Sequence, residues 1–324
     1  MRDVRRVASV GGRAGVSLVL IGWILGRSNL HGVWDALSSA DPFPLLFAWG
    51  LLALGYLLRI TRWRYLLRAL EVRASLGYLF RSFMVGVFFN QLLPSTIGGD
   101  TVRGYDSWRA GTSKPGAVAV IFVDRFLGLF ALVGFAVAAV FVADTELAGR
   151  LGRFPTIVAG LAILMLLVAW VAFLSPASLL PRSGVKRLLP GPRLRRWLKG
   201  GKEAFAMFRR EKRILLGGLL VSICVQGLVI AFHMTIARSL GLAIPAREFF
   251  LIIPVATLVM MLPISINAIG IRENVYAFLF GFYGLGEEQA LAFAWLVLGI
   301  VLLNAVLGGL FFLARRRAGE GVTA

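Results

Sequence analysis

A run of polar residues, glycine and proline interrupts an apolar stretch near residue 94. The residues that flank Pro94 are Asn90, Gln91, Gly98, Gly99, Asp100 and Arg103. Pro94 removes a backbone donor and kinks or ends a helix, while the two glycines permit a close backbone approach or a positive φ. A helix that restarts at Asp100 points free N–H groups toward an anionic group. The pattern predicts a ligand site, but a turn capped by Asp100, with Arg103 as a cytoplasmic anchor, explains the same residues.

A second apolar stretch has a similar interruption at Pro263. Both interruptions contain Leu-Pro, a core of Ser or Thr, Ile, and Gly or Asn, and an arginine nine positions after the proline. The prolines are the expected hinges. The residues of the second interruption with candidate binding roles are Asn267, Gly270, Arg272 and Glu273. Arginine is suited to two-pronged contact with phosphate or carboxylate, so arginines beside two breaks suit a phosphate-bearing lipid headgroup.

An adjacent acid and base, Asp124 and Arg125, lie inside an otherwise apolar run. Charges within a membrane span are costly and usually face the protein interior with a partner. Neighbouring residues point to different faces of a helix, so each needs its own partner. The candidates are Arg103 or Arg272 for Asp124, and Asp100 or Glu273 for Arg125. Such pairs predict substrate contact or an ion-pair network that locks the helices together, and the two are compatible.

The elements that position these residues are predicted to be membrane helices. The 324 residues are 58% hydrophobic and 16% charged, with a mean hydropathy of +0.81, whereas a soluble domain carries about 25% charged residues. A full span takes roughly 20 apolar residues, and six segments qualify: 14–26, 43–60, 117–142, 156–174, 214–237 and 289–313. Backbone broken at membrane depth is tolerated only against protein or a watery cavity. The stretches 76–105 and 249–284 are therefore predicted to be re-entrant helical hairpins in an all-α polytopic membrane protein.

The distribution of charge predicts the orientation. The net charge of +19 comes from 35 Lys and Arg against 16 Asp and Glu. The basic residues gather in 59–73, in 175–213 and at Arg315–Arg317, and all of these fall on one side if each hairpin returns to the side it left. The positive-inside rule then places both termini in the cytoplasm. This explains the charge more simply than nucleic-acid binding does. The expected location is the cell inner (cytoplasmic) membrane.

The order of the segments predicts an inverted repeat within one transmembrane domain, 1–324. Each interrupted stretch is preceded by two spans and followed by one, which gives halves at 1–145 and 150–318 joined through a basic cytoplasmic linker, 175–213. The first hairpin then opens from the cytoplasm and the second from the opposite face. Paired, interrupted hydrophobic segments in corresponding halves indicate the binding site of a transporter. Coincidence between two Pro- and Gly-containing breaks is the alternative.

These motifs, taken together and in order, resemble the lysylphosphatidylglycerol synthase transmembrane family, also called flippase-like. The residues that carry the resemblance are Asn90 to Pro94, Gly98 to Asp100, Arg103, Asp124, Arg125, Gly128 and Gly270 to Glu273. The family includes the flippase half of enzymes that lysinylate phosphatidylglycerol and move the product to the outer leaflet. The chain ends four residues after Glu320, without an aminoacyl-transferase domain. The resemblance therefore implies lipid translocation and not lipid aminoacylation.

The expected function is a lipid flippase or lipid-headgroup transporter that moves a phospholipid or a lipid-linked polar headgroup across the cytoplasmic membrane. A lipid-modifying transferase is an alternative. Because the carboxylates are scattered along the sequence and no catalytic motif is present, we expect that the protein is not an enzyme. A non-transporting partner of a cell-envelope lipid enzyme is another alternative. Membrane lipids are the expected partners, either anionic or aminoacylated phospholipids or glycolipids, and a homodimer or a cell-envelope lipid synthase partner is left open. Cys224, His31 and His233 are too few and too dispersed to predict a metal site, and no cofactor is expected.

Overall fold

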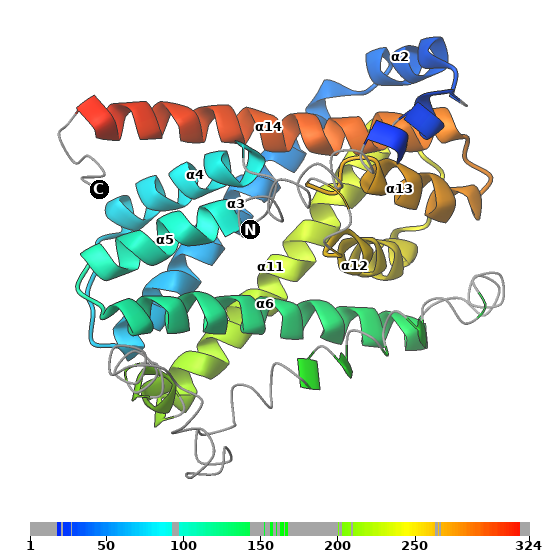
Figure 1. The fold of residues 1–324 in the computed structure, drawn as a ribbon. Coiled ribbons are helices and arrows are strands. Elements are labelled where there is room, and N and C mark those ends of the chain that lie inside the picture. Colours follow the sequence, from blue (N-terminus) through cyan, green and yellow to red (C-terminus); the bar gives the residue numbers. More distant parts are fainter. Residues whose placement is uncertain are drawn as a thin grey trace, which may run out of the picture.

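The computed structural model describes residues 18–142 apart from 21, 27 and 93–96, isolated positions between 152 and 167, and residues 200–317 apart from 201, 202, 209, 263, 264 and 266. The regular elements named within these ranges are all helices (Figure 1), as the sequence predicts. The predicted spans 14–26 and 156–174 and the linker 175–213 lie wholly or partly outside the described residues, and so do the hinges Pro94 and Pro263.

Within the described residues, four helices are long and apolar enough to cross a membrane. They are α3 (Pro42–Ala69), α6 (Lys114–Val142), α11 (Lys212–Ser239) and α14 (Glu287–Arg317), and they coincide with four of the six predicted spans. The 28 residues of α3 or of α11 make a helix about 42 Å long, compared with a hydrocarbon core of roughly 30 Å. The chain is therefore a multi-pass membrane protein.

Each interrupted stretch consists of two short helices. The first contains α4 (Leu76–Leu92) and α5 (Ile97–Arg109), and the second contains α12 (Phe249–Met260) and α13 (Ile271–Gly281). The two helices of each stretch pack against one another. Even α4, with 17 residues, is only about 25 Å long, which is less than the thickness of a hydrocarbon core. The predicted interruptions are present, and each arm of a hairpin is shorter than a full span.

α3 extends further than the sequence analysis predicts. A span ending at residue 60 and a basic loop over 59–73 are expected, but the helix continues to Ala69. Arg59 and Arg62 therefore belong to the helix and not to a loop. No proline or glycine occurs between Gly55 and Ala69 to end it. The side chains that continue its buried face are Trp63, Leu66 and Leu67, all fully buried.

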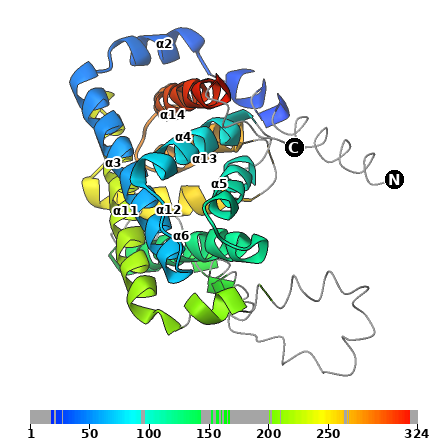
Figure 2. The same ribbon diagram turned by 90° about the vertical axis from the view of Figure 1, so that its left-hand side faces the viewer.

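The helices form two similar groups. In Figure 1, α14 and α6 run along opposite edges, with the α4–α5 hairpin between them in one half and the α12–α13 hairpin in the other. α3 and α11 pack along one another and lie to one side of both hairpins in the turned view (Figure 2). One hydrophobic cluster surrounds each hairpin. Two smaller elements, α2 (Leu30–Ser38) and η1 (Ala246–Glu248), precede α3 and α12.

The packing contacts of the two groups correspond. α4 packs on α14 and α12 packs on α6, while α5 packs on α6 and α13 packs on α14. The helices α3, α4, α5 and α6 can be matched in order with α11, α12, α13 and α14. Under this matching, the α4–α14 contact corresponds to the α12–α6 contact, and the α5–α6 contact corresponds to the α13–α14 contact. This is the relation expected between two halves of a pseudo-symmetric bundle.

The ends of the matched helices also correspond. A residue in the left-handed conformation follows each of the matched helices: Glu71 (φ 61°) after α3 and Gly241 (φ 62°) after α11. After α5 and α13 the equivalents are Gly111 (φ 118°) and Gly284 (φ 72°). Each end closes with the backbone hydrogen bond of a Schellman cap: Val72 N to Leu67 O (3.1 Å), Leu242 N to Ala237 O (3.0 Å), Thr112 N to Ser107 O (3.2 Å) and Leu285 N to Phe280 O (3.3 Å). Four matched caps provide a residue-by-residue register between the groups.

Candidate functional site

A buried carboxylate on α6 joins arginines from two other helices. Asp124 accepts a hydrogen bond from Arg62 Nε of α3 at 2.7 Å and one from Arg103 Nη1 of α5 at 3.0 Å. All three side chains are less than a tenth exposed. Ser222 of α11 accepts a further bond from Arg62 Nη1 at 2.6 Å. This arrangement ties the first hairpin to three long helices through charged groups.

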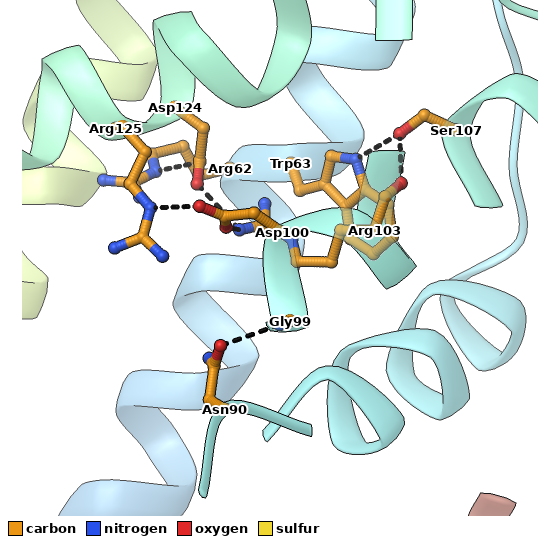
Figure 3. Close-up of polar contacts among 9 residues, drawn as sticks. All are labelled: Arg62, Trp63, Asn90, Gly99, Asp100, Arg103, Ser107, Asp124 and Arg125. Atoms are coloured by element: carbon orange, nitrogen blue, oxygen red, sulfur yellow. Dashed lines mark hydrogen bonds and ion pairs between the residues drawn. The ribbon is translucent and has the colours of Figure 1, made fainter. Parts of the chain in front are cut away.

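A second, more accessible pair extends this arrangement. Arg125 Nε donates to Asp100 Oδ2 at 2.8 Å, and Asp100 lies 3.9 Å from Arg103 Nη1. The Arg125 side chain is half exposed. The five residues form an alternating series, which we call the ion-pair network (Figure 3): Arg62, Asp124, Arg103, Asp100 and Arg125. Of the predicted alternatives, the structure forms Asp124 with Arg103 and Arg125 with Asp100.

Positive charge exceeds negative charge around the network. The network holds three arginines and two aspartates, and Arg59, one turn before Arg62 on α3, adds a fourth guanidinium that interacts electrostatically with Asp124. Counted over these six described side chains alone, the arginines exceed the aspartates by two. A cation inside a membrane protein is costly unless it is compensated, so this excess favours an anionic ligand.

Aromatic rings hold Arg103 in place. Its guanidinium carbon lies 4.7 Å from the centre of the Trp63 ring and 5.7 Å from that of Phe83. Trp63 Nε1 donates to Ser107 Oγ at 3.1 Å, and Ser107 Oγ donates to Arg103 O at 2.8 Å. Arg103 Nε and Nη2 are buried and make no hydrogen bond within the described part of the chain. Cation–π contacts are the available compensation for these two nitrogens.

The two interruptions meet inside the molecule. Asn267 Nδ2 of the second donates to the backbone oxygen of Gln91 beside the first, at 3.1 Å. Asn90 Oδ1 accepts from Gly99 N at 2.7 Å, which links the two arms of the first hairpin. A Cβ at Gly99 would lie 2.6 Å from the oxygen of Gly86, so this crossing needs glycine. We call Asn90, Gln91, Gly99 and Asn267 the break junction.

The second interruption positions its residues through its own backbone. Glu273 Oε2 accepts from Gly270 N at 2.7 Å, and Arg272 Nη2 donates to Asn267 O at 3.3 Å. Positive φ angles occur at Asn267 (50°), Ala268 (57°) and Gly270 (84°), and for alanine this conformation is strained. Arg272 Nη1 is buried and lacks a hydrogen-bond partner among the described residues. Glu273 caps its own helix, and no ion pair to Arg125 is formed between these described side chains.

The predicted candidates therefore form two neighbouring groups. Asp100, Arg103, Asp124 and Arg125 lie in the ion-pair network, and Asn90, Gln91, Gly99, Asn267, Gly270, Arg272 and Glu273 lie at or beside the break junction. Gly98 is buried next to Gly99. The sequence analysis missed Arg59, Arg62, Trp63 and Ser107. Arginines three residues apart in a segment without a helix breaker were the available signal.

The chain was compared with known proteins. The family model of the lysylphosphatidylglycerol synthase TM region matches residues 12–312. The chain belongs to this family. The family match covers both hairpins and all four long helices almost to their ends, and so both groups of candidate residues lie within it.

Two curated relatives from Methanothermobacter thermautotrophicus, each named "UPF0104 membrane protein", are similar over most of their length. One is 22% identical over 301 residues, which is 86% of this chain and 84% of the relative. The other is 25% identical over 296 residues, 86% of each chain. The similarity extends over most of the chain and is not confined to the site.

Proposed function

We propose that this member of the lysylphosphatidylglycerol synthase transmembrane family is a flippase that moves an anionic phospholipid, or a lipid-linked anionic headgroup, across the cytoplasmic membrane. The observation that carries the proposal is the positive excess around the ion-pair network. Among the described residues, Arg59, Arg62 and Arg103 share the carboxylate of Asp124, while Arg125 pairs with Asp100. A headgroup phosphate supplies the missing negative charge, and guanidinium groups bind it in two-pronged geometry.

The matched halves support a transport mechanism. The exchanged packing pairs and the four Schellman caps favour an inverted repeat in which α4–α5 and α12–α13 are re-entrant hairpins. In transporters of this design the substrate binds near the middle of the bilayer, where interrupted helices from the two repeats meet. The Asn267–Gln91 hydrogen bond lies at such a meeting point. Movement of one hairpin against the other would alternately expose the network to the two membrane faces.

The charges at the helix ends support the orientation. Arg68, Arg109, Lys114, Lys212 and Arg315 lie at the ends of the long helices and the first hairpin that share one side in Figure 1. The carboxylates at the other side are Asp41, Glu248, Glu287 and Glu288. The positive-inside rule assigns the basic side to the cytoplasm. The first hairpin then opens toward the cytoplasm and the C-terminus is cytoplasmic.

Lipid movement in proteoliposomes tests the proposal. Wild-type protein is compared with Arg125→Gln, which alters the accessible edge of the network, and with Arg68→Gln, an exposed arginine on α3 outside it. The wild type should move fluorescent phosphatidylglycerol. Arg125→Gln should slow this movement about tenfold, as expected for a loss of about 1.4 kcal/mol, and Arg68→Gln should not. Equal rates in both variants, or no movement of any anionic lipid by well-folded wild type, would contradict the proposal.

A further inference from the structure

A basic pocket lies at the end of the first hairpin that is remote from the break junction. Its volume is about 400 Å³, within the range of about 300–1,000 Å³ that is usual for small-molecule sites. Its charged lining comes from three separate segments: Arg73 between α3 and α4, Arg109 at the end of α5, and Arg315 near the end of α14. We call it the basic pocket.

One of the three arginines is fixed and neutralised by a buried carboxylate. Arg315 donates two hydrogen bonds to Asp106 of α5, at 2.8 and 2.6 Å, and Asp106 is fully buried. Arg73 and Arg109 are exposed, and neither forms an ion pair with any of the residues that the structure describes. Within the described part of the chain, the pocket therefore presents two positive charges that no ion pair compensates, beside a rigid third guanidinium.

Neutral groups complete the wall of the pocket. Tyr78 donates its hydroxyl hydrogen to Asp106 O at 3.0 Å, which links α4 to α5 at the level of Arg315. Ser75 caps α4 by accepting from Tyr78 N at 3.2 Å. The remaining free N–H groups of the first turn of α4 point out of the helix start and favour an anion. Charge and donors thus converge on one opening.

The other half of the molecule shows that the fold does not require these arginines. In the register given by the helix caps, Arg73 corresponds to Ala243 and Arg109 corresponds to Phe282. The equivalent connections around α12 and α13 fold with the same caps and without the charges. The arginines are therefore a feature added to one hairpin and not a condition for folding it.

We propose that the basic pocket binds a phosphate ester, as a second anion site separate from the ion-pair network. The chemistry suits both the headgroup phosphate of a membrane lipid and a free phosphate. Trp108, beside Arg109, is partly exposed and carries Lys114 over its ring at 4.6 Å. Tryptophan and lysine at a helix end are typical of the membrane–water interface, which brings lipid headgroups within reach of the pocket. The assignment does not depend on transport.

Binding to purified full-length protein tests the site. The test variant is Arg73→Gln with Arg109→Gln. The control is Arg68→Gln with Arg213→Gln, which removes the same charge from exposed positions on the same side of the bundle. One arm measures retention of phosphatidylglycerol against phosphatidylcholine by native mass spectrometry. The other measures thermal stabilisation by inorganic phosphate and by glycerol 3-phosphate.

We expect the wild type and the control to retain phosphatidylglycerol or to be stabilised by phosphate. The affinity of the test variant should be about tenfold lower, which corresponds to about 1.4 kcal/mol. A loss confined to the lipid arm identifies a headgroup site, and a loss in both arms identifies a general phosphate site. Equal binding by the two double variants would overturn the proposal, because it would reflect surface charge alone. Absence of binding in both arms for the wild type would overturn it as well.

Discussion

The two hairpins share a scaffold but lie in different chemical surroundings. Aligning their helix caps places Arg62 of α3 opposite Phe232 of α11, and Asp124 of α6 opposite Val297 of α14. The α4–α5 hairpin thus carries the ion-pair network in addition to its hydrophobic cluster. The α12–α13 hairpin instead packs in an aromatic cluster, in which the ring centres of Tyr276 and Phe293 are 4.9 Å apart. In the same register Arg103 of α5 lies opposite Tyr276 of α13, although an arginine follows each proline by nine residues.

This difference separates residues that hold the fold from those that, under the proposed function, recognise a ligand. A buried ion pair contributes little net stability, because desolvation offsets the attraction between the charges. Aromatic packing stabilises without that cost. One pseudo-equivalent half folds around an aromatic cluster, so the charges in the other half are not needed to form a hairpin. Under the proposed function, anion recognition would belong to the first hairpin and support to the second.

The largest expected effect comes from removing the shared carboxylate. Asp124→Asn leaves Arg62 and Arg103 buried without their acid, and we expect a loss of about 3–5 kcal/mol in stability. Phe280→Leu in the aromatic half removes one ring from a fully buried position and should be less harmful, at about 1.5 kcal/mol. Thermal unfolding in detergent, monitored by size-exclusion chromatography, compares the two. A milder effect of Asp124→Asn than of Phe280→Leu would reverse the assignment.

A charge-free triple variant sharpens the same comparison. Replacing Arg62 and Arg103 by Met and Asp124 by Leu removes the ions together, and apolar replacement of a buried ion cluster is often neutral or stabilising. We expect this variant to recover most of the stability lost in Asp124→Asn while lipid movement stays abolished. Recovery of both properties would show that the network has no role in recognition.

A moderate effect is expected at the crossing of the first hairpin. In Gly99→Ala the new Cβ would lie 2.6 Å from Gly86 O and 2.6 Å from Asn90 Nδ2. Because one of these atoms belongs to backbone, the helices must separate, at a cost of about 1–3 kcal/mol. Gly281→Ala in the second hairpin meets nothing within 4 Å and should change the melting temperature little. Equal shifts in the two variants would show that close packing of α4 and α5 is not a special feature of the first hairpin.

The sequence was sufficient to predict the breaks and to include Asp124–Arg103 and Arg125–Asp100 among the alternative ion pairs, because proline, glycine and charge are conspicuous in apolar surroundings. Arg62 was not predicted, since an arginine near the end of a span looks like an ordinary cytoplasmic anchor. The end of α3 was also hidden, because the left-handed residue there is Glu71 and not glycine. The contact of Asn267 with Gln91 joins positions 176 residues apart, and no local pattern specifies it.

The smallest expected effect concerns that contact, the joint between the two hairpins. Asn267→Gly removes the hydrogen bond to Gln91 O but keeps a residue that tolerates the φ of 50°, so stability should fall by about 0.5–1.5 kcal/mol. Asn267→Ala loses the bond and also strains the backbone, which adds about 1–2 kcal/mol. Chemical denaturation of both variants measures the difference. If Ala and Gly are equally destabilising, backbone strain is absent at this joint. If neither destabilises, the hydrogen bond does not hold the hairpins together, and their coupling must come from helix packing alone.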